Sequence, residues 1–124
     1  MRPIKFRGIR LLSNDWEYGN LIQRPDGGHF IEIGDLRLCP VQDFSIGQFT
    51  GLLDKNGKEI YEGDIVKCDR FVYEVVFEEK RFASYGLHRK EDMFMHYFGE
   101  AMESQQCEVI GNIHDNPELI EKGK

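Results

Sequence analysis

The sequence predicts a mainly β fold with minor α content, and three observations lead to this prediction. Residues 48–68 contain three short apolar segments separated by two turn signals, Asp54-Lys-Asn-Gly57 and Glu62-Gly63-Asp64. Residues 71–77 place an aromatic or aliphatic residue at every second position, which is the period of a β-strand. Residues 1–47 are short apolar runs broken by glycines and prolines. Together these patterns indicate a domain of short antiparallel strands.

The length of 124 residues suits one domain with its own hydrophobic core. Hydrophobic residues make up 40% of the chain and charged residues 31%, which is typical of a soluble globular protein and excludes the disordered class. We expect a single domain over residues 1–124. Its core should lie within residues 48–113, and the strands of residues 1–47 should pack on that core.

The central hairpin is the clearest local prediction. Asn56 and Gly57 tolerate positive φ, and the Asp54 carboxylate can accept hydrogen bonds from the turn backbone, so residues 48–53 should fold back on residues 58–61. Asp54-Lys-Asn-Gly57 resembles the start of a calcium loop, but its glycine comes too early for that spacing. Gly63 then allows a bend that Asp64 can cap. These residues are explained by turn geometry and predict no metal site.

Two helices are expected in the last third of the chain. Large apolar residues recur at three- and four-residue spacing over residues 91–103, which predicts an amphipathic helix that packs on the sheet. Asn116 is a good N-cap and Pro117 suits the first helical position, so residues 116–121 should form a short C-terminal helix.

The net charge of −6 is unevenly distributed. Residues 1–50 contain six Lys or Arg and six Asp or Glu, whereas residues 51–124 contain ten and sixteen. An acidic surface weakens binding to a phosphate backbone, so a nucleic-acid partner is disfavoured. The densest basic cluster is Arg2, Lys5, Arg7 and Arg10, and the last three lie on a strand expected from Ile4 to Leu12. We interpret this cluster as a solvated strand face, with Ile4 and Phe6 turned toward the core.

Trp16 is the only tryptophan, and it precedes a hairpin expected to turn at Gly19-Asn20. It could anchor a protein partner or cover the edge of the core. The candidate binding residues are therefore Lys5, Arg7, Arg10 and Trp16. No residue stands out as catalytic, because the four histidines show neither ligand spacing nor a recognisable triad. We expect no enzymatic activity, no metal and no cofactor.

Cys39, Cys68 and Cys107 are widely spaced, and each lies in an apolar run. An odd number of cysteines without a CxxC pair favours buried thiols over a disulfide framework or a zinc site. The N-terminus lacks the apolar segment of a signal peptide, and no run approaches the ~20 apolar residues of a membrane span. These observations predict a cytoplasmic protein.

Three blocks of the sequence resemble the YopX family of phage and prophage proteins. They are the opening Met1-Arg-Pro-Ile-Lys-Phe-Arg7, the central segment from Gln48 to Val66, and the closing segment from Cys107 to Leu119. The blocks occur in the family's order and span nearly the whole chain. The resemblance implies a mostly β domain with an SH3-like barrel core and a gene carried by a phage or prophage. It implies no catalytic residues, because no activity is assigned to the family.

Two classes of function remain open. The chain could be an accessory protein that binds an unknown protein partner or itself, possibly as a homo-oligomer, which fits its acidic character and short strands. Alternatively, it could be a nucleic-acid-binding SH3-like module that uses Lys5, Arg7 and Arg10 with nearby aromatic residues. We favour the first class, and neither involves a membrane.

Overall fold

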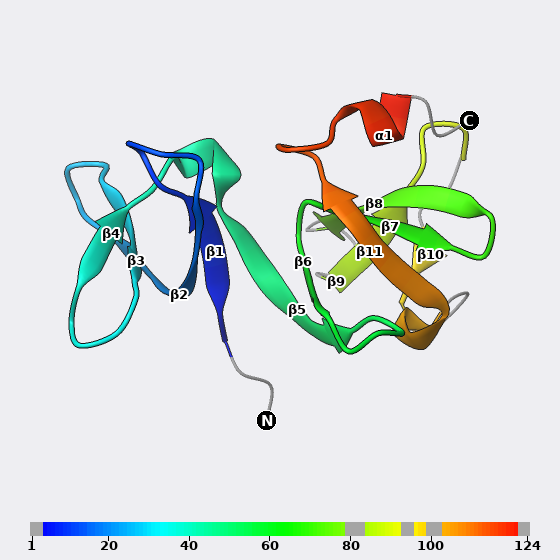
Figure 1. The fold of residues 1–124 in the computed structure, drawn as a ribbon, viewed down its shortest axis with the longest axis horizontal. Helices are drawn as coiled ribbons and strands as arrows, with labels where there is room; N and C mark the ends of the chain where they lie inside the picture. The colour runs from blue at the N-terminus through cyan, green and yellow to red at the C-terminus, as the bar shows by residue number, and fades with distance from the viewer. Residues whose placement is uncertain (1–3, 79–83, 93–95, 99–102, 122–124) are drawn as a thin grey trace. The chain divides into compact units, whose positions relative to one another are not determined.

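The computed structural model describes residues 4–78, 84–92, 96–98 and 103–121. These residues form two compact units, the first ending at Gly51 and the second beginning at Leu52 (Figure 1). The boundary lies close to residue 48, where the core was expected to begin. The expected packing of residues 1–47 on that core stays a prediction.

The fold is mainly β, as predicted, and its strands form two antiparallel sheets. The elements in chain order are β1 (Phe6–Ile9), β2 (Trp16–Gln23), β3 (His29–Glu32), β4 (Leu38–Pro40), the 3-10 helix η1 (Asp43–Ser45), β5 (Gly47–Leu53), β6 (Glu59–Tyr61), β7 (Asp64–Cys68), β8 (Phe71–Glu78), β9 (Ser84–His88), β10 (His96–Tyr97), the 3-10 helix η2 (Ser104–Gln106), β11 (Cys107–Asn112) and α1 (Glu118–Glu121).

In the first unit, the strands are arranged in the order β4-β3-β2-β1-β5. The buried hydrophobic residues of this unit include Ile31, Cys39 and Val41. Strand β5 carries the chain into the second unit, where it neighbours β6 in the predicted hairpin. Gly57 in this hairpin has φ 81° and Gly63 in the next turn has φ 93°, as turn geometry required.

The hairpin expected at Gly19-Asn20 is wrong, because β2 continues through both residues and pairs with β3. A Cβ atom at Gly19 would lie 2.1 Å from the carbonyl oxygen of Glu32. Glycine is therefore needed here for the close approach of two strands, and not for a turn. The sequence could not distinguish these two reasons for the same residue.

The second unit has the strand order β10-β9-β8-β7-β11. The alternation of residues 71–77 is confirmed: Tyr73 and Val75 of β8 pack in the core with Ile60, Val66 and Leu87. The strands of the described residues do not close into one sheet, so the expected SH3-like barrel is not confirmed.

The amphipathic helix expected near residues 91–103 is wrong where the structure describes this segment. Residues 90–91 lie in a turn, and His96 and Tyr97 form β10, which pairs with Leu87 and Gly86 of β9. The edge of β9 offers backbone hydrogen-bond partners, and this pairing overrides the helical period of the apolar residues. Residues 93–95 and 99–102 lie outside the described residues.

The short C-terminal helix is confirmed in shortened form as α1. The side chain of Asn116 has a different use from the expected N-cap. Its Oδ1 atom accepts a hydrogen bond from the Asn112 N–H at the end of β11, at 3.3 Å. The Asn116 side chain thus joins the segment before α1 to the end of β11.

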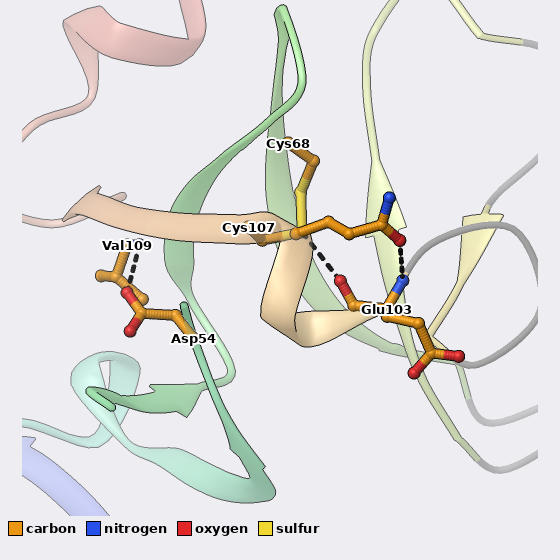
Figure 2. Close-up of a disulfide and its surroundings, with 6 residues drawn as sticks. Asp54, Cys68, Glu103, Cys107 and Val109 are labelled. Atoms are coloured by element: carbon orange, nitrogen blue, oxygen red, sulfur yellow. Dashed lines mark hydrogen bonds between the residues drawn. A yellow bond between two sulfur atoms is a disulfide. The ribbon is translucent and has the colours of Figure 1, made fainter. Parts of the chain in front are cut away.

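The expectation of three free thiols is wrong, because Cys68 and Cys107 form a disulfide (Figure 2). The two residues are directly opposite each other on β7 and β11, with Cα atoms 4.2 Å apart, and both are fully buried. Cys39 is a free, buried cysteine. The spacing of 39 residues hid the pair in the sequence, since only the strand register brings the two cysteines together.

The turn between β3 and β4 carries local strain. The Arg37 N–H donates to the Gly34 carbonyl at 2.9 Å, and both central residues have positive φ, 49° at Asp35 and 61° at Leu36. This is the conformation of a type I′ turn, which favours Asn-Gly over a residue such as leucine. The Leu36 side chain is 85% exposed, so it gains little packing in return.

Replacing Leu36 with glycine should therefore raise the free energy of unfolding by about 0.5–1 kcal/mol, because glycine adopts positive φ without steric cost. Urea denaturation of the purified protein measures this change. The matched control is Leu38→Gly, in the adjoining strand β4, which should destabilise the protein by about 1 kcal/mol. A loss of stability in Leu36→Gly would contradict the prediction.

Candidate functional site

The first unit contains all four residues that the sequence singled out for binding. Strand β1 lies between β2 and β5, with Arg7 opposite Tyr18 and Gly47. Ile9 lies opposite Trp16, so Arg7 and Trp16 are diagonal neighbours on one sheet face. The structure thus brings these candidates onto adjacent strands of one sheet.

Arg7 is not part of a solvated face, and that interpretation is wrong. Its side chain is only 5% exposed, and its guanidinium carbon lies 4.6 Å from the centre of the Trp16 ring. Lys5 is half-buried, and its Nζ atom lies 5.5 Å from the centre of the Phe49 ring. Ile4, which was expected to face the core, is 71% exposed. A cation–π contact with the half-buried Trp16 ring helps to explain how the Arg7 cation can be buried.

Arg10 is held by a carboxylate. Its Nε atom donates to Glu17 Oε2 at 2.6 Å, and this hydrogen bond raises the pKa of Arg10 above its ordinary value. Arg2 of the predicted cluster lies outside the described residues. The three described cations are each engaged by a ring or a carboxylate of the same unit.

A groove of about 620 Å³ lies in the first unit, and the sequence did not predict it. Its apolar lining residues are Leu11, Phe30, Pro40, Val41 and Phe44, and His29, Gln42 and Asp43 contribute polar groups. Two of the apolar lining residues are open to solvent, Phe44 at 66% and Leu11 at 55% exposed, and Leu12, the residue after Leu11, is 97% exposed. Two adjacent leucines in a polar loop, and a phenylalanine between Asp43 and Ser45, were the signal available in the sequence.

Buried polar contacts fix the walls of this groove. Ser45 is 1% exposed, accepts a hydrogen bond from the Ile9 N–H at 2.8 Å and donates to the Gln42 carbonyl at 2.6 Å. These bonds anchor η1, which presents Phe44 outward. On the other side, the Leu11 N–H donates to the Pro40 carbonyl at 3.1 Å. The exposed apolar residues therefore belong to an ordered surface.

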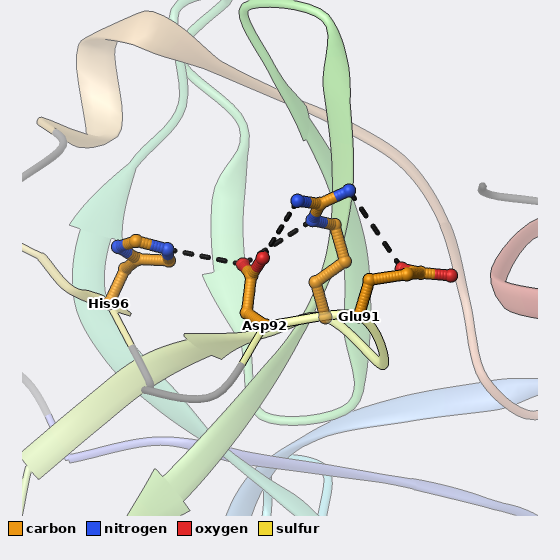
Figure 3. A network of polar contacts seen from close by, with 4 residues as sticks. Glu91, Asp92 and His96 are labelled. Carbon is orange, nitrogen blue, oxygen red and sulfur yellow. Dashed lines mark hydrogen bonds and ion pairs between the residues drawn. The ribbon is translucent and has the colours of Figure 1, made fainter.

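The second unit holds the network Arg89, Asp92 and His96, shown in Figure 3. Asp92 Oδ1 accepts from Arg89 at 2.7 Å, and Asp92 Oδ2 lies 3.1 Å from Nε2 of His96. The hydrogen bond from Arg89, and then the hydrogen bond from His96, lower the pKa of Asp92. The Arg89 guanidinium also lies 4.1 Å from the centre of the Phe71 ring.

Tyr73 borders this network. Its ring and that of His96 meet edge to face with centres 5.8 Å apart, and burial followed by the charge of Asp92 raises the pKa of Tyr73. A carboxylate that orients an imidazole can support proton transfer, but the same contacts also fix β10 and its turn. The sequence reading found no carboxylate partner for any histidine, although Asp92 lies four residues before His96.

The described residues contain no group of three or more His, Cys, Asp or Glu side chains that could hold a metal ion. Among the helices of the described segments, none has the length and apolar character needed to cross a bilayer. The mixed groove near Lys5, of about 590 Å³, is lined by Asn20, Glu32 and Asp35 together with Ile4 and Leu36.

Comparison with known proteins agrees with this architecture. The chain is similar to the crystal structure of protein EF1440 from Enterococcus faecalis, with a TM-score of 0.53 and 24% sequence identity over 97% of this chain and 99% of that chain. At this identity the likeness concerns the fold alone. A search of curated proteins found no match. The family model of the YopX protein matches residues 5–121. The chain therefore belongs to the YopX protein family.

Proposed function

We propose that this protein is a phage- or prophage-encoded accessory protein that acts by binding another protein in the cytoplasm of its bacterial host. The observation that supports this proposal is the groove of the first unit, in which Leu11 and Phe44 are exposed, with Leu12 exposed next to Leu11 in the chain. No catalytic step is part of the proposal. An SH3-like barrel over residues 48–113 remains proposed from the family resemblance, and the groove does not depend on it.

The fold of the first unit leaves large apolar side chains in water. Burying one leucine or phenylalanine side chain contributes about 1.5–3 kcal/mol, so two or three such residues can anchor a protein contact. Ordered apolar patches are typical of protein-interaction sites, whereas isolated exposed apolar residues are common everywhere. Here Leu11 and Phe44 line one groove, Leu12 follows Leu11 in the chain, and the buried hydrogen bond of Ser45 holds one wall of the groove.

The alternative, a nucleic-acid-binding module, has weaker support. Lys5 and Arg7 each lie over an aromatic ring, and Arg10 pairs with Glu17. The same contacts occupy one face of the rings that bases would stack on. Titration into labelled DNA and RNA at low salt tests this alternative. Tight binding that weakens steeply with salt would support it and count against the protein-binding proposal.

The double variant Leu11→Ser/Phe44→Ser tests the proposed binding surface. Both side chains are already exposed, so the fold should be retained while the apolar contact is lost. We expect affinity for a captured host protein, or for a second copy, to fall by about 100-fold or more, since two buried anchors are removed. Affinity capture followed by titration, together with light scattering, measures the loss.

The matched control is Leu36→Ser, which removes an apolar side chain that is 85% exposed and does not line this groove. It should leave binding unchanged. Equal loss in the control, or full binding by the double variant, would contradict the proposed surface. A wild-type protein that stays monomeric and retains no host protein would contradict the proposed function itself.

A further inference from the structure

We propose that the Cys68–Cys107 disulfide is a redox-controlled clasp for the C-terminal strand. When a dithiol reduces it, β11 is released from the sheet of the second unit while β8 and β9 remain folded. This proposal is independent of the proposed binding function, because it concerns different residues and a different readout.

The position of β11 makes it the element that can open. It is the outermost strand of its sheet, and β7 is its neighbour there. Its pairing with β7 is interrupted by a register shift between Val109 and Gly111. Edge strands with an irregular ladder open at lower free energy than central strands. A covalent bond at Cys107, the first residue of β11, prevents this opening at one end (Figure 2).

The other attachments of β11 to the second unit are non-covalent. Asp54 Oδ2 accepts from the Val109 N–H at 2.9 Å, and the Cys107 carbonyl accepts from the Lys55 N–H at 2.9 Å. The Ile113 N–H donates to the Gly63 carbonyl at 2.9 Å. Each of these bonds can break and reform, so after reduction none of them prevents β11 from leaving the sheet.

The surroundings of Cys107 also accommodate the reduced form. Its sulfur lies 3.7 Å from the carbonyl oxygen of Glu103. A disulfide sulfur has no proton to donate, whereas a thiol at this position can donate to that carbonyl. The remaining neighbours in the core are apolar, which suits a small buried thiol. The reduced state therefore has a hydrogen-bond acceptor that the oxidised state does not use.

The reaction is ordinary thiol–disulfide exchange. A thiolate of the dithiol attacks one sulfur of the bond when the start of β11 frays, and a mixed disulfide forms as the second protein thiolate leaves. The second thiol of the reductant then displaces the protein sulfur. Cys68 and Cys107 gain two electrons and two protons in total, and the dithiol becomes a disulfide. Opening of β11 then exposes the backbone edge of β7, a surface suited to strand addition.

The test compares the oxidised and reduced wild-type protein. Cells are lysed in an alkylating reagent without reductant, and the alkylated cysteines are counted by mass spectrometry after denaturation. We expect one alkylated cysteine, Cys39, and three after incubation of the native protein with dithiothreitol. Hydrogen exchange in peptides covering residues 104–113 should then accelerate by roughly 30-fold or more. This factor corresponds to the lower end of the stabilisation that a disulfide typically provides. Peptides from β8 and β9 should remain more slowly exchanging than those of β11, because these strands exchange only when the whole unit unfolds.

Two variants complete the design. Cys39→Ala should keep the full response, and Cys107→Ala should exchange rapidly in β11 whether or not dithiothreitol is present. After reduction, equal exchange rates in β11 and in β8 and β9 would overturn the proposal, because the strands would then open only together and the disulfide would be a purely structural cross-link. The proposal would also be overturned if dithiothreitol does not reduce the disulfide of the native protein. A third contradicting result is a protein that has three alkylated cysteines as isolated and does not form the disulfide when a thiol oxidant is added.

Discussion

The double variant Cys68→Ala/Cys107→Ala should lose about 4 kcal/mol of the free energy of unfolding relative to the oxidised protein. The disulfide closes a loop with a sequence separation of 39 residues, and the chain-entropy relation gives about this value for a loop of that length. Both sulfurs are fully buried in the core of the second unit, so the loss of packing adds to the effect. Guanidinium denaturation under non-reducing conditions measures the change.

Cys39→Ala is the matched control, since it removes a buried sulfur that takes part in no cross-link. It should cost about 1 kcal/mol, as a small cavity does. Adding a reductant should destabilise the wild-type protein and leave the double variant unaffected. A double variant that is as stable as the Cys39→Ala protein would show that the cross-link contributes nothing.

Asp54→Ala should lower the free energy of unfolding by about 3–5 kcal/mol, because three part-buried N–H groups lose a charged acceptor, at a cost of about 1.5–3 kcal/mol each that water partly recovers. The Asp54 side chain is 1% exposed. Its Oδ1 atom accepts from the N–H groups of Asn56 at 2.8 Å and Lys58 at 2.9 Å, and Oδ2 accepts from Val109 at 2.9 Å. One carboxylate therefore closes the hairpin turn and ties it to β11.

Asp54→Asn separates these two roles. The amide oxygen can still accept from the turn, but the NH₂ group would meet the Val109 N–H, and two donors cannot pair. We expect a loss of about 1–3 kcal/mol, with increased hydrogen exchange confined to β11. If Asp54→Asn is as unstable as Asp54→Ala, the hydrogen bond to β11 accounts for the whole loss of stability. That result would contradict the predicted contribution of the hydrogen bonds within the turn.

The lowered pKa of Asp54 also predicts that the free energy of unfolding depends on pH. Burial raises the pKa of its carboxyl group, but the hydrogen bonds from Val109, Lys58 and Asn56 outweigh burial, and the net pKa is lowered. The stability it contributes is thus fully present above the unfolded value of about 3.9 and is lost as the pH falls through the folded pKa. The stability difference between wild type and Asp54→Asn should shrink below about pH 4. Urea titrations at pH 7 and pH 3 measure it, and a larger difference at pH 3 would contradict the assignment.

Local chemistry determined the parts of the fold that the sequence predicted correctly. The hairpin around Asp54 and Gly57, the turn at Gly63 and the alternating strand β8 each depend on residues close together in the chain. A carboxylate that bonds its own turn, a glycine that accepts positive φ and a period of two are readable without knowledge of the partner strands. The family resemblance rested on the same central segment.

The candidate site depended on contacts between distant residues, and the sequence named only half of each contact. Lys5, Arg7 and Trp16 were recognised, but the register that stacks Arg7 on Trp16 and Lys5 on Phe49 was not. The groove combines Leu11 with Phe30 and Phe44, which come from three separate segments. A residue's exposure is decided by what covers it, and a single strand does not contain that information.

The same reason explains the other corrections. Glycine at position 19 serves a close approach of strands, the helical period near residue 91 gives way to pairing along β9, and two cysteines far apart in the chain meet across β7 and β11. The sequence alone determined the mainly β class, the central turns and the family of this protein. Tertiary structure decided which charges are buried, which apolar residues remain in water and which cysteines pair, because these depend on strand register between residues that the chain keeps far apart.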